Sequence, residues 1–228
     1  MFSSKLTRNI SFIQSNIKSA ALQTGRNIND IKIVAVTKAF PSPIWNRALK
    51  NNLTTIGESQ IQEVENKVKD FKQREQIKLH LIGHLQNNKA RKAVKYFDTI
   101  QTIDSIKLLE RINQASEEKN KNQRIFLQVN TGKDPNKFGF TEKEVFLAAK
   151  QATTFQNITL EGIMTIPPNN ISKENLQSIY KKTRKIRDRV NKSIEKRCNN
   201  LSMGMSNDYE IAITEGATHI RLGTALFG

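Results

Sequence analysis

The stretch IKIVAVTKAF, residues 31–40, sets the pattern that the rest of the chain repeats. Its first part is a run of β-branched apolar residues, which is typical of a strand buried on both faces in a parallel sheet. Two prolines follow at once and end the run, because proline cannot continue a central strand. Side chains alternate along a strand, so Lys38 shares a side with Val34 and Val36. The pattern predicts a strand over Ile31–Val36 with a lysine just beyond its carboxyl end.

Lys38 has two interpretations. If its side of the strand faces the interior of a barrel, Lys38 is an amine at the mouth of an apolar cavity. There the amine loses solvation, and the neutral form can attack a carbonyl group. The ordinary alternative is a solvated lysine at a strand end, in a chain with 37 Lys and Arg residues. The rest of the chain has to decide between the two.

Length and composition indicate a globular chain with one core. The 228 residues are 37% hydrophobic and 25% charged, which is ordinary for one α/β domain. Cys198 is the single cysteine, so an internal disulfide is excluded and a reducing compartment is indicated; we expect the cytoplasm. No apolar run approaches membrane-spanning length, and we expect no membrane partner. The N-terminus lacks the apolar core of a secretory signal.

The formal net charge is +16, which is compatible with a nucleic-acid partner. However, the basic residues are spread along the chain, and Asn is abundant beside Lys, as codon bias in an AT-rich genome would produce. We therefore interpret the charge as a solvated basic surface, which still attracts small anions such as phosphate.

The first 29 residues contain no acidic residue, as in a mitochondrial transit peptide. The competing interpretation is an amphipathic helix, which we favour as part of the mature fold. Its inner face would carry five apolar residues, Leu6, Ile10, Ile13, Ile17 and Leu22.

Eight strand patterns alternate with helix patterns along the chain. The predicted strands are Ile31–Val36, Thr54–Glu58, Lys78–Gly83, Thr99–Ile103, Arg124–Asn130, Thr159–Ile166, Leu201–Met205 and His219–Leu226. Thr141, with Glu144 three residues on, predicts a capping box at one of the helices. This order predicts an α/β protein, a single (β/α)₈ TIM-type barrel over residues 1–228 with an extra N-terminal helix.

The two ends of the chain complete the predicted ring. The last strand leaves no room for a following helix, and the N-terminal helix could cover that gap. The alternative, an open doubly wound sheet, usually has fewer strands and a Gly-rich first turn, which this chain lacks.

The C-terminal region supplies parts of a phosphate site. In a barrel the active site lies at the carboxyl ends of the strands, and the loops after strands seven and eight often hold phosphate. SMGMSND closes strand seven and opens a helix, which places Ser206 at the positive end of that helix. In RLGTALFG, Gly223 allows close backbone approach and Thr224 offers a hydroxyl.

Arg221 interrupts an otherwise apolar strand and shares a face with Gly223, so we expect it inside the barrel. A buried guanidinium is costly without a partner, and it does not escape by losing its proton. Either it forms an internal ion pair, for example with Glu58 or Asp208, or it donates to a ring nitrogen of a ligand.

No metal site is predicted. His80 and His84 lack a third ligand at usable spacing and are expected to be core or loop residues.

A lysine after strand one, a phosphate cup and an inward arginine together suit pyridoxal 5′-phosphate (PLP), held as a Schiff base.

Several segments, in order, resemble the YggS/PROSC family of pyridoxal phosphate homeostasis proteins over essentially the whole chain. They are VAVTK, GESQIQE, HLIGHLQNNK, TID, NKFG, GIMTIP, LSMGMSND and RLGTALFG. The resemblance implies a fold related to the N-terminal barrel of alanine racemase, with Lys38 as the Schiff-base residue. It further implies that Ser206, Gly223 and Thr224 bind the phosphate and that Arg221 faces the pyridine nitrogen.

One segment departs from the family pattern. Where the family commonly has GENYVQE, this chain has GESQIQE, so Ser59 and Gln60 replace an asparagine and a tyrosine. A cofactor contact or surface role that the asparagine and tyrosine have in the family is therefore not expected of Ser59 and Gln60.

The residues of the predicted PLP site indicate that little catalysis is to be expected. An arginine at the pyridine nitrogen keeps that nitrogen unprotonated and weakens the ring as an electron sink. A racemase of the related fold also needs an acid/base residue from a C-terminal domain in a dimer, and we find no such domain before Gly228. We therefore expect a monomeric PLP carrier with no catalytic residue, whose partners are PLP and apo PLP-dependent enzymes. The alternatives are a weak racemase-like PLP enzyme and, from another class, a nucleic-acid-binding protein.

Overall fold

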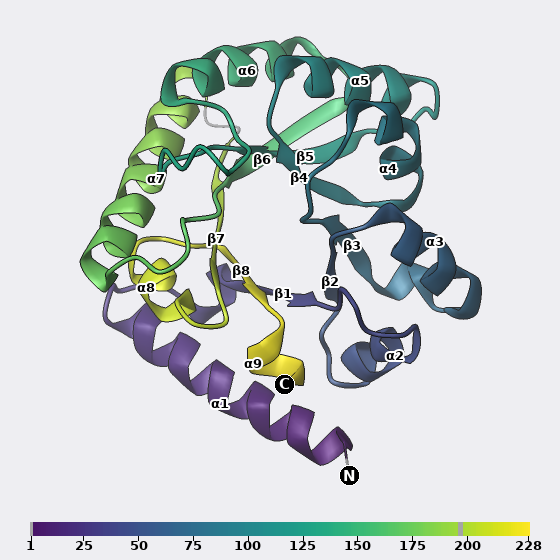
Figure 1. Ribbon diagram of the computed structural model, residues 1–228. Coiled ribbons are helices and arrows are strands. Elements are labelled where there is room, and N and C mark those ends of the chain that lie inside the picture. Colours follow the sequence, from purple (N-terminus) through teal and green to yellow (C-terminus); the bar gives the residue numbers. More distant parts are fainter. Residues whose placement is uncertain (1, 196–197) are drawn as a thin grey trace.

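The computed structural model, which describes residues 2–195 and 198–228, contains a closed barrel of parallel strands (Figure 1). Each strand pairs with the next in chain order, and β8 pairs with β1 to close the ring. The strands are β1 (Lys32–Val36), β2 (Thr55–Glu58), β3 (Lys78–Leu81), β4 (Thr99–Ile103), β5 (Gln123–Gln128), β6 (Ile158–Met164), β7 (Asn200–Met205) and β8 (His219–Leu222). The predicted (β/α)₈ barrel is confirmed.

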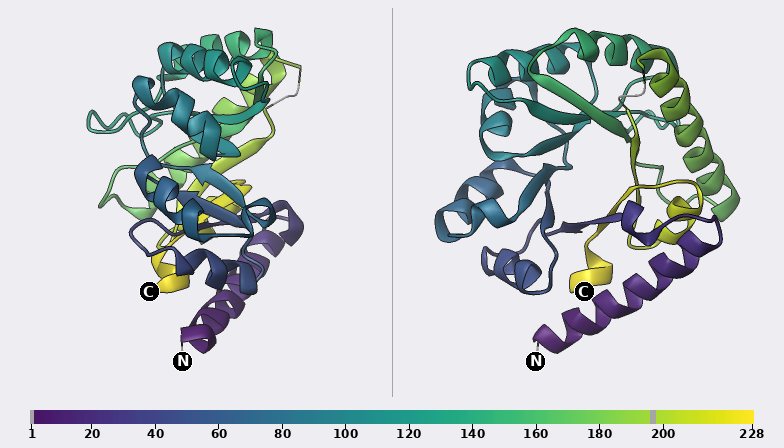
Figure 2. Two further views of the ribbon diagram at one scale, coloured as in Figure 1. Left: turned by 90° about the vertical axis from the view of Figure 1, so that its right-hand side faces the viewer. Right: turned by 180° about the vertical axis from the view of Figure 1, so that it is seen from behind.

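Helices surround the barrel (Figure 2). They are α2 (Pro43–Lys50), α3 (Ile61–Asp70), α4 (Ala90–Tyr96), α5 (Ile106–Glu117), α6 (Glu142–Thr154), α7 (Lys173–Ser193) and α8 (Tyr209–Thr214), with 3₁₀ turns η1 (Ile28–Asp30), η2 (Arg74–Gln76) and η3 (Asn87–Lys89). The capping box at α6 is confirmed, because the Thr141 hydroxyl accepts the Glu144 N–H and the Glu144 carboxylate accepts the Thr141 N–H. None of the helices within the described ranges combines the length and apolar character that a membrane crossing requires.

The last strand is shorter than expected and a helix does follow it. β8 ends at Leu222, and a single helical turn, α9 (Thr224–Phe227), comes next. The prediction of a strand to Leu226 is wrong because the backbone at Gly223, with φ −115° and ψ −79°, leaves the extended conformation.

The N-terminal helix α1 (Phe2–Leu22) lies beside α8 and α9 (Figure 1). The Asn9 side chain donates to the Leu226 carbonyl at 2.9 Å, and that of Asn16 donates to the Tyr209 hydroxyl at 3.0 Å. The helix therefore covers this part of the ring, as expected.

Most of the predicted inner face of α1 is buried, but Leu22 is 67% exposed. A helix advances about 100° per residue, so position 22 lies well off the stripe that Ile17 occupies. Ala20 and Ala21 are buried in its place.

Alternate residues of the strands face different surroundings. Ala35 and Ile56 belong to the hydrophobic core between strands and helices. Val34 lies on the other side of β1, where a Cβ added to Gly57 would meet it at 2.9 Å. Glycine at position 57 therefore makes room for a valine inside the barrel, and Glu58, next in the strand, faces outward.

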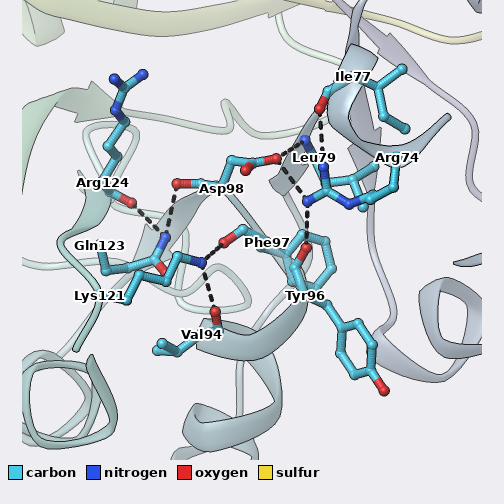
Figure 3. A network of polar contacts seen from close by, with 10 residues as sticks. All are labelled: Arg74, Ile77, Leu79, Val94, Tyr96, Phe97, Asp98, Lys121, Gln123 and Arg124. Carbon is cyan, nitrogen blue, oxygen red and sulfur yellow. Dashed lines mark hydrogen bonds and ion pairs between the residues drawn. The ribbon is translucent and has the colours of Figure 1, made fainter. Parts of the chain in front are cut away.

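A polar network ties together the amino-terminal ends of β3, β4 and β5 (Figure 3). The Asp98 carboxylate, directly before β4, accepts the Leu79 N–H at 2.7 Å and an Arg74 N–H at 2.8 Å. The Lys121 ammonium donates to two carbonyls at the end of α4, both at 2.6 Å. Because these contacts lie at the end of the strands remote from the predicted site, they serve stability.

Candidate functional site

A cavity of about 830 Å³ opens at the carboxyl ends of the strands. The five predicted site residues all line it: Lys38, Ser206, Arg221, Gly223 and Thr224. Closure of the barrel brings them together, because β1 pairs with β8 and Val34 lies opposite Arg221 in the register. In the side view, the loops after β5 and β6 and the C-terminal turn lie on one side of the barrel (Figure 2, left). The roles of the five residues in binding stay predictions.

Lys38 lies at the rim of this cavity, in the turn that follows β1. Its side chain is exposed, as in the second of the two interpretations, so the loss of solvation that a place inside the barrel would cause is not found. The physical reason is that β1 ends at Val36, and the two further residues carry Lys38 beyond the apolar interior. Lys38 is thus a solvent-accessible amine at the mouth of the 830 Å³ cavity.

Ser206 forms a polar cup with the turn after β8. Its hydroxyl accepts the N–H of Gly223 at 3.3 Å and the N–H of Ala225 at 3.1 Å. Since the oxygen accepts both bonds, its own proton remains available to donate. A Cβ at Gly223 would meet Val36, another cavity residue, at 3.5 Å, so a side chain there would take up room within the cup.

Arg221 is buried inside the barrel, as predicted, with 4% of its surface exposed. One guanidinium nitrogen, Nη1, donates to the Ser202 hydroxyl at 2.8 Å, and the other, Nη2, donates to the Thr165 carbonyl at 2.8 Å. These bonds use two of its five N–H groups. Burial lowers the pKa of Arg221, although an arginine keeps its charge.

The suggested ion pair with Glu58 or Asp208 is not formed. Glu58 faces outward and pairs with Lys67 at 2.6 Å, while Asp208 accepts the Met205 N–H at 2.6 Å. Asp208 attracts Arg221 from farther away and raises its pKa somewhat against the effect of burial.

An interior hydrogen-bond chain, formed by Arg221, Ser202, Gln101 and His80, crosses the barrel. Ser202 accepts from Arg221 and donates to the Gln101 carbonyl oxygen at 2.6 Å, and the Gln101 amide nitrogen lies 2.7 Å from His80 Nδ1. Because the amide nitrogen is a donor, His80 Nδ1 accepts and the ring is neutral. Burial lowers the pKa of His80 to about 3, which agrees with this assignment.

Sequence reasoning missed three of these polar residues, namely Thr165, Ser202 and Gln101. For Gln101 and Ser202 the available signal was a polar side chain within a predicted strand, whereas Thr165 contributes only its backbone carbonyl, which leaves no signal in the sequence. His80 is a core residue and His84 a loop residue, as expected. Within residues 2–195 and 198–228, no group of His, Cys, Asp and Glu could hold a metal ion.

The two residues that depart from the family pattern are differently placed. Ser59 lines the main cavity and also a neighbouring one of about 410 Å³, whereas Gln60 lines only the neighbouring one and is exposed. The change to serine therefore alters the cavity wall itself.

The fold and the cavity define a barrel of the alanine racemase class. Residues 9–228 match the family described as alanine racemase, N-terminal domain. The alanine racemase of Clostridium difficile 630 shares the fold alone, with a TM-score of 0.76 at 16% identity over 99% of this chain and 56% of that chain.

Proteins with higher sequence identity to this chain show which group within the family it belongs to. A pyridoxal phosphate homeostasis protein of Vibrio alginolyticus is 34% identical over 99% of this chain and 97% of the relative. PipY of Synechococcus elongatus PCC7942 has been solved without PLP and with PLP bound. The structure without PLP has a TM-score of 0.89 at 30% identity, and the structure with PLP has a TM-score of 0.87 at 29% identity. Both matches cover 98% of this chain and 100% of PipY. The chain belongs to the pyridoxal phosphate homeostasis proteins of the alanine racemase N-terminal domain family.

Proposed function

We propose that this protein binds PLP in the 830 Å³ cavity and serves PLP homeostasis as a carrier. The observation that carries the proposal is that one cavity gathers an amine, a cup of hydroxyl and amide groups, and a buried guanidinium. The relative from Vibrio alginolyticus has the name of a PLP homeostasis protein, and PipY has been solved with PLP bound, which supports the same assignment.

The donor set fits the three functional groups of PLP. The hydroxyl proton of Ser206, the hydroxyl of Thr224 and the backbone around Gly223 suit a phosphate. Arg221 has N–H groups that its protein contacts do not use, and these suit a pyridine nitrogen. When bound, the aldehyde of PLP supplies a reversible Schiff base with the Lys38 amine.

The same residues favour holding the cofactor over using it. The Arg221 charge disfavours a protonated pyridine nitrogen, which a PLP enzyme needs for a strong electron sink. Tyr180, which interacts electrostatically with Arg221, is fully buried, and burial raises the pKa of its hydroxyl. A hydroxyl that is so reluctant to ionise is a poor acid/base group. We further propose that the protein works as a cytoplasmic monomer and passes PLP to apo-enzymes.

A spectroscopic titration tests the proposal. PLP is added to the purified protein, to Lys38→Ala and to the matched control Lys32→Ala, which removes a lysine at the opposite end of β1. We expect a saturable Schiff-base band with the wild type and with Lys32→Ala, and none with Lys38→Ala. The same band in Lys38→Ala would overturn the assignment of the cavity.

Chiral analysis of amino acids incubated with the protein then separates a carrier from an enzyme. The PLP-loaded protein is incubated with single L-amino acids, and their D-forms are measured over time. A carrier shows no sustained conversion, whereas conversion over many turnovers would establish a racemase-like enzyme.

A further inference from the structure

The Lys38 side chain starts from a strained turn. Residues 37–40 form a tight turn in which the Phe40 N–H donates to the Thr37 carbonyl at 3.2 Å. Its third residue, Ala39, has φ of 64°, in the left-handed region that favours glycine. Such strain persists only where surrounding contacts hold the backbone in place, and it gathers at functional sites.

Helix α3 holds the peptide unit that precedes Lys38. The ammonium of Lys67, on α3, donates to the Thr37 carbonyl at 2.9 Å. Lys67 is 5% exposed, and its charge is balanced by the buried carboxylate of Glu58 at 2.6 Å. The same Glu58 oxygen accepts from the Thr37 hydroxyl at 2.6 Å and from the Trp45 indole N–H at 3.0 Å. A buried, multiply bonded ion pair therefore fixes this carbonyl.

The same helix holds the peptide unit that follows Lys38. Glu63, one turn before Lys67 on α3, accepts the Ala39 N–H at 3.1 Å. The two α3 side chains also attract one another, with 3.8 Å between the Lys67 ammonium and the Glu63 carboxylate. One contact anchors the carbonyl before the Lys38 Cα and the other anchors the N–H after it. Together they fix the direction in which the Lys38 side chain leaves the backbone.

We propose that Glu63 and Lys67 are positioning residues that aim the Lys38 amine at the aldehyde of PLP. The inference rests on the proposed function, since it concerns the bond that Lys38 forms there. Neither residue lines the 830 Å³ cavity, so neither touches the cofactor. Their effect is confined to Schiff-base formation, while the phosphate cup and Arg221 act independently of them.

Glu63 offers the sharper test, because its side chain is 29% exposed and its loss should not unfold the protein. Loss of Lys67 would instead leave buried Glu58 without its counter-charge. Glu65 is a matched control: it lies on α3, is 23% exposed, and pairs with Lys92 at 3.1 Å, away from the Lys38 turn. Glu63→Gln keeps an oxygen that can accept the Ala39 N–H.

The experiment compares two ligands. PLP forms the Schiff base, whereas pyridoxine 5′-phosphate has the ring and phosphate but no aldehyde. We expect Glu63→Ala to weaken PLP binding about tenfold, because the turn that this contact holds in the wild type must then be ordered when the Schiff base forms. Its affinity for pyridoxine 5′-phosphate should be unchanged. Glu63→Gln should restore most of the PLP affinity, and Glu65→Ala should behave as the wild type, with all variants equal in apo-protein thermal stability to within a few degrees.

Two results would overturn the inference. One is PLP affinity in Glu63→Ala within about twofold of the wild type. The other is equal weakening of both ligands, which would mean a general distortion of the cavity. Failure of the proposed function looks different, because the wild type itself would then form no band with PLP.

Discussion

Acidification should destabilise this protein through two buried histidines. His80 and His219 lie in the barrel with 6% and 3% of their surfaces exposed, and their rings stack 6.1 Å apart. Burial lowers the pKa of each from 6.5 to about 3. The unfolded chain therefore takes up protons below pH 6.5 that the native protein does not bind. The contribution of these two histidines to the free energy of unfolding is fully present above pH 6.5 and is lost as the pH falls toward 3.

The size of the effect follows from the pKa shift. Each pH unit below 6.5 removes about 1.4 kcal/mol per histidine, so pH 5 removes about 2 kcal/mol for one and about 4 kcal/mol for both. This is a large part of an ordinary unfolding free energy of about 5–15 kcal/mol. Protonation of His80 would also oppose the Gln101 amide that donates to it, and so disturb the interior hydrogen-bond chain that holds Arg221.

Urea denaturation at pH 7, 6 and 5 measures this loss, with the fluorescence of buried Trp45, the single tryptophan, as the signal. Carboxyl groups also titrate toward pH 5, so the informative quantity is the difference from His80→Gln. That variant keeps an acceptor for Gln101 but cannot take up a proton. It should lose about 2 kcal/mol less than the wild type between pH 7 and 5. Identical pH dependence in the two proteins would refute the reasoning.

Three further substitutions test the fold by urea denaturation at pH 7. Gly204→Ala should destabilise the protein by about 3 kcal/mol, because Gly204 has φ of +91° and the new Cβ would lie 2.5 Å from the Cβ of Ala212. An unchanged urea midpoint would contradict this backbone conformation at Gly204. Lys121→Met removes both hydrogen bonds to carbonyls at the end of α4 and should cost about 2 kcal/mol, whereas a neutral effect would mean that water replaces them. Thr141→Ala should lose about 1 kcal/mol with its capping box, and no loss would show that the cap is dispensable.

The barrel was predictable because its information is local. Along the chain, eight short strand patterns alternate with helix patterns, and few topologies accept eight such units. The same regularity placed Lys38 and the C-terminal residues at one end of the barrel, where the structure shows them around one cavity.

Partners of buried charges were not predictable, because they depend on packing between distant segments. Glu58 could be matched with Arg221 by charge alone, but Gly57 occupies the inward position of β2, so Glu58 faces α2 and α3 and finds Lys67. Arg221 instead bonds to Ser202 and a carbonyl. The sequence left the exposure of Lys38 open for a similar reason, because a two-residue extension past a strand end decides whether an amine is inside the barrel or at its rim.

The most direct test of the account is to locate the covalent bond to PLP. The protein is loaded with PLP, reduced with borohydride, digested, and its peptides are mapped by mass spectrometry, with Lys32→Ala and Lys38→Ala treated in parallel. The account predicts one major pyridoxyl adduct, on Lys38, at close to one per chain, and its loss in Lys38→Ala. A label scattered over surface lysines, or a major adduct at another lysine in the wild type, would contradict it.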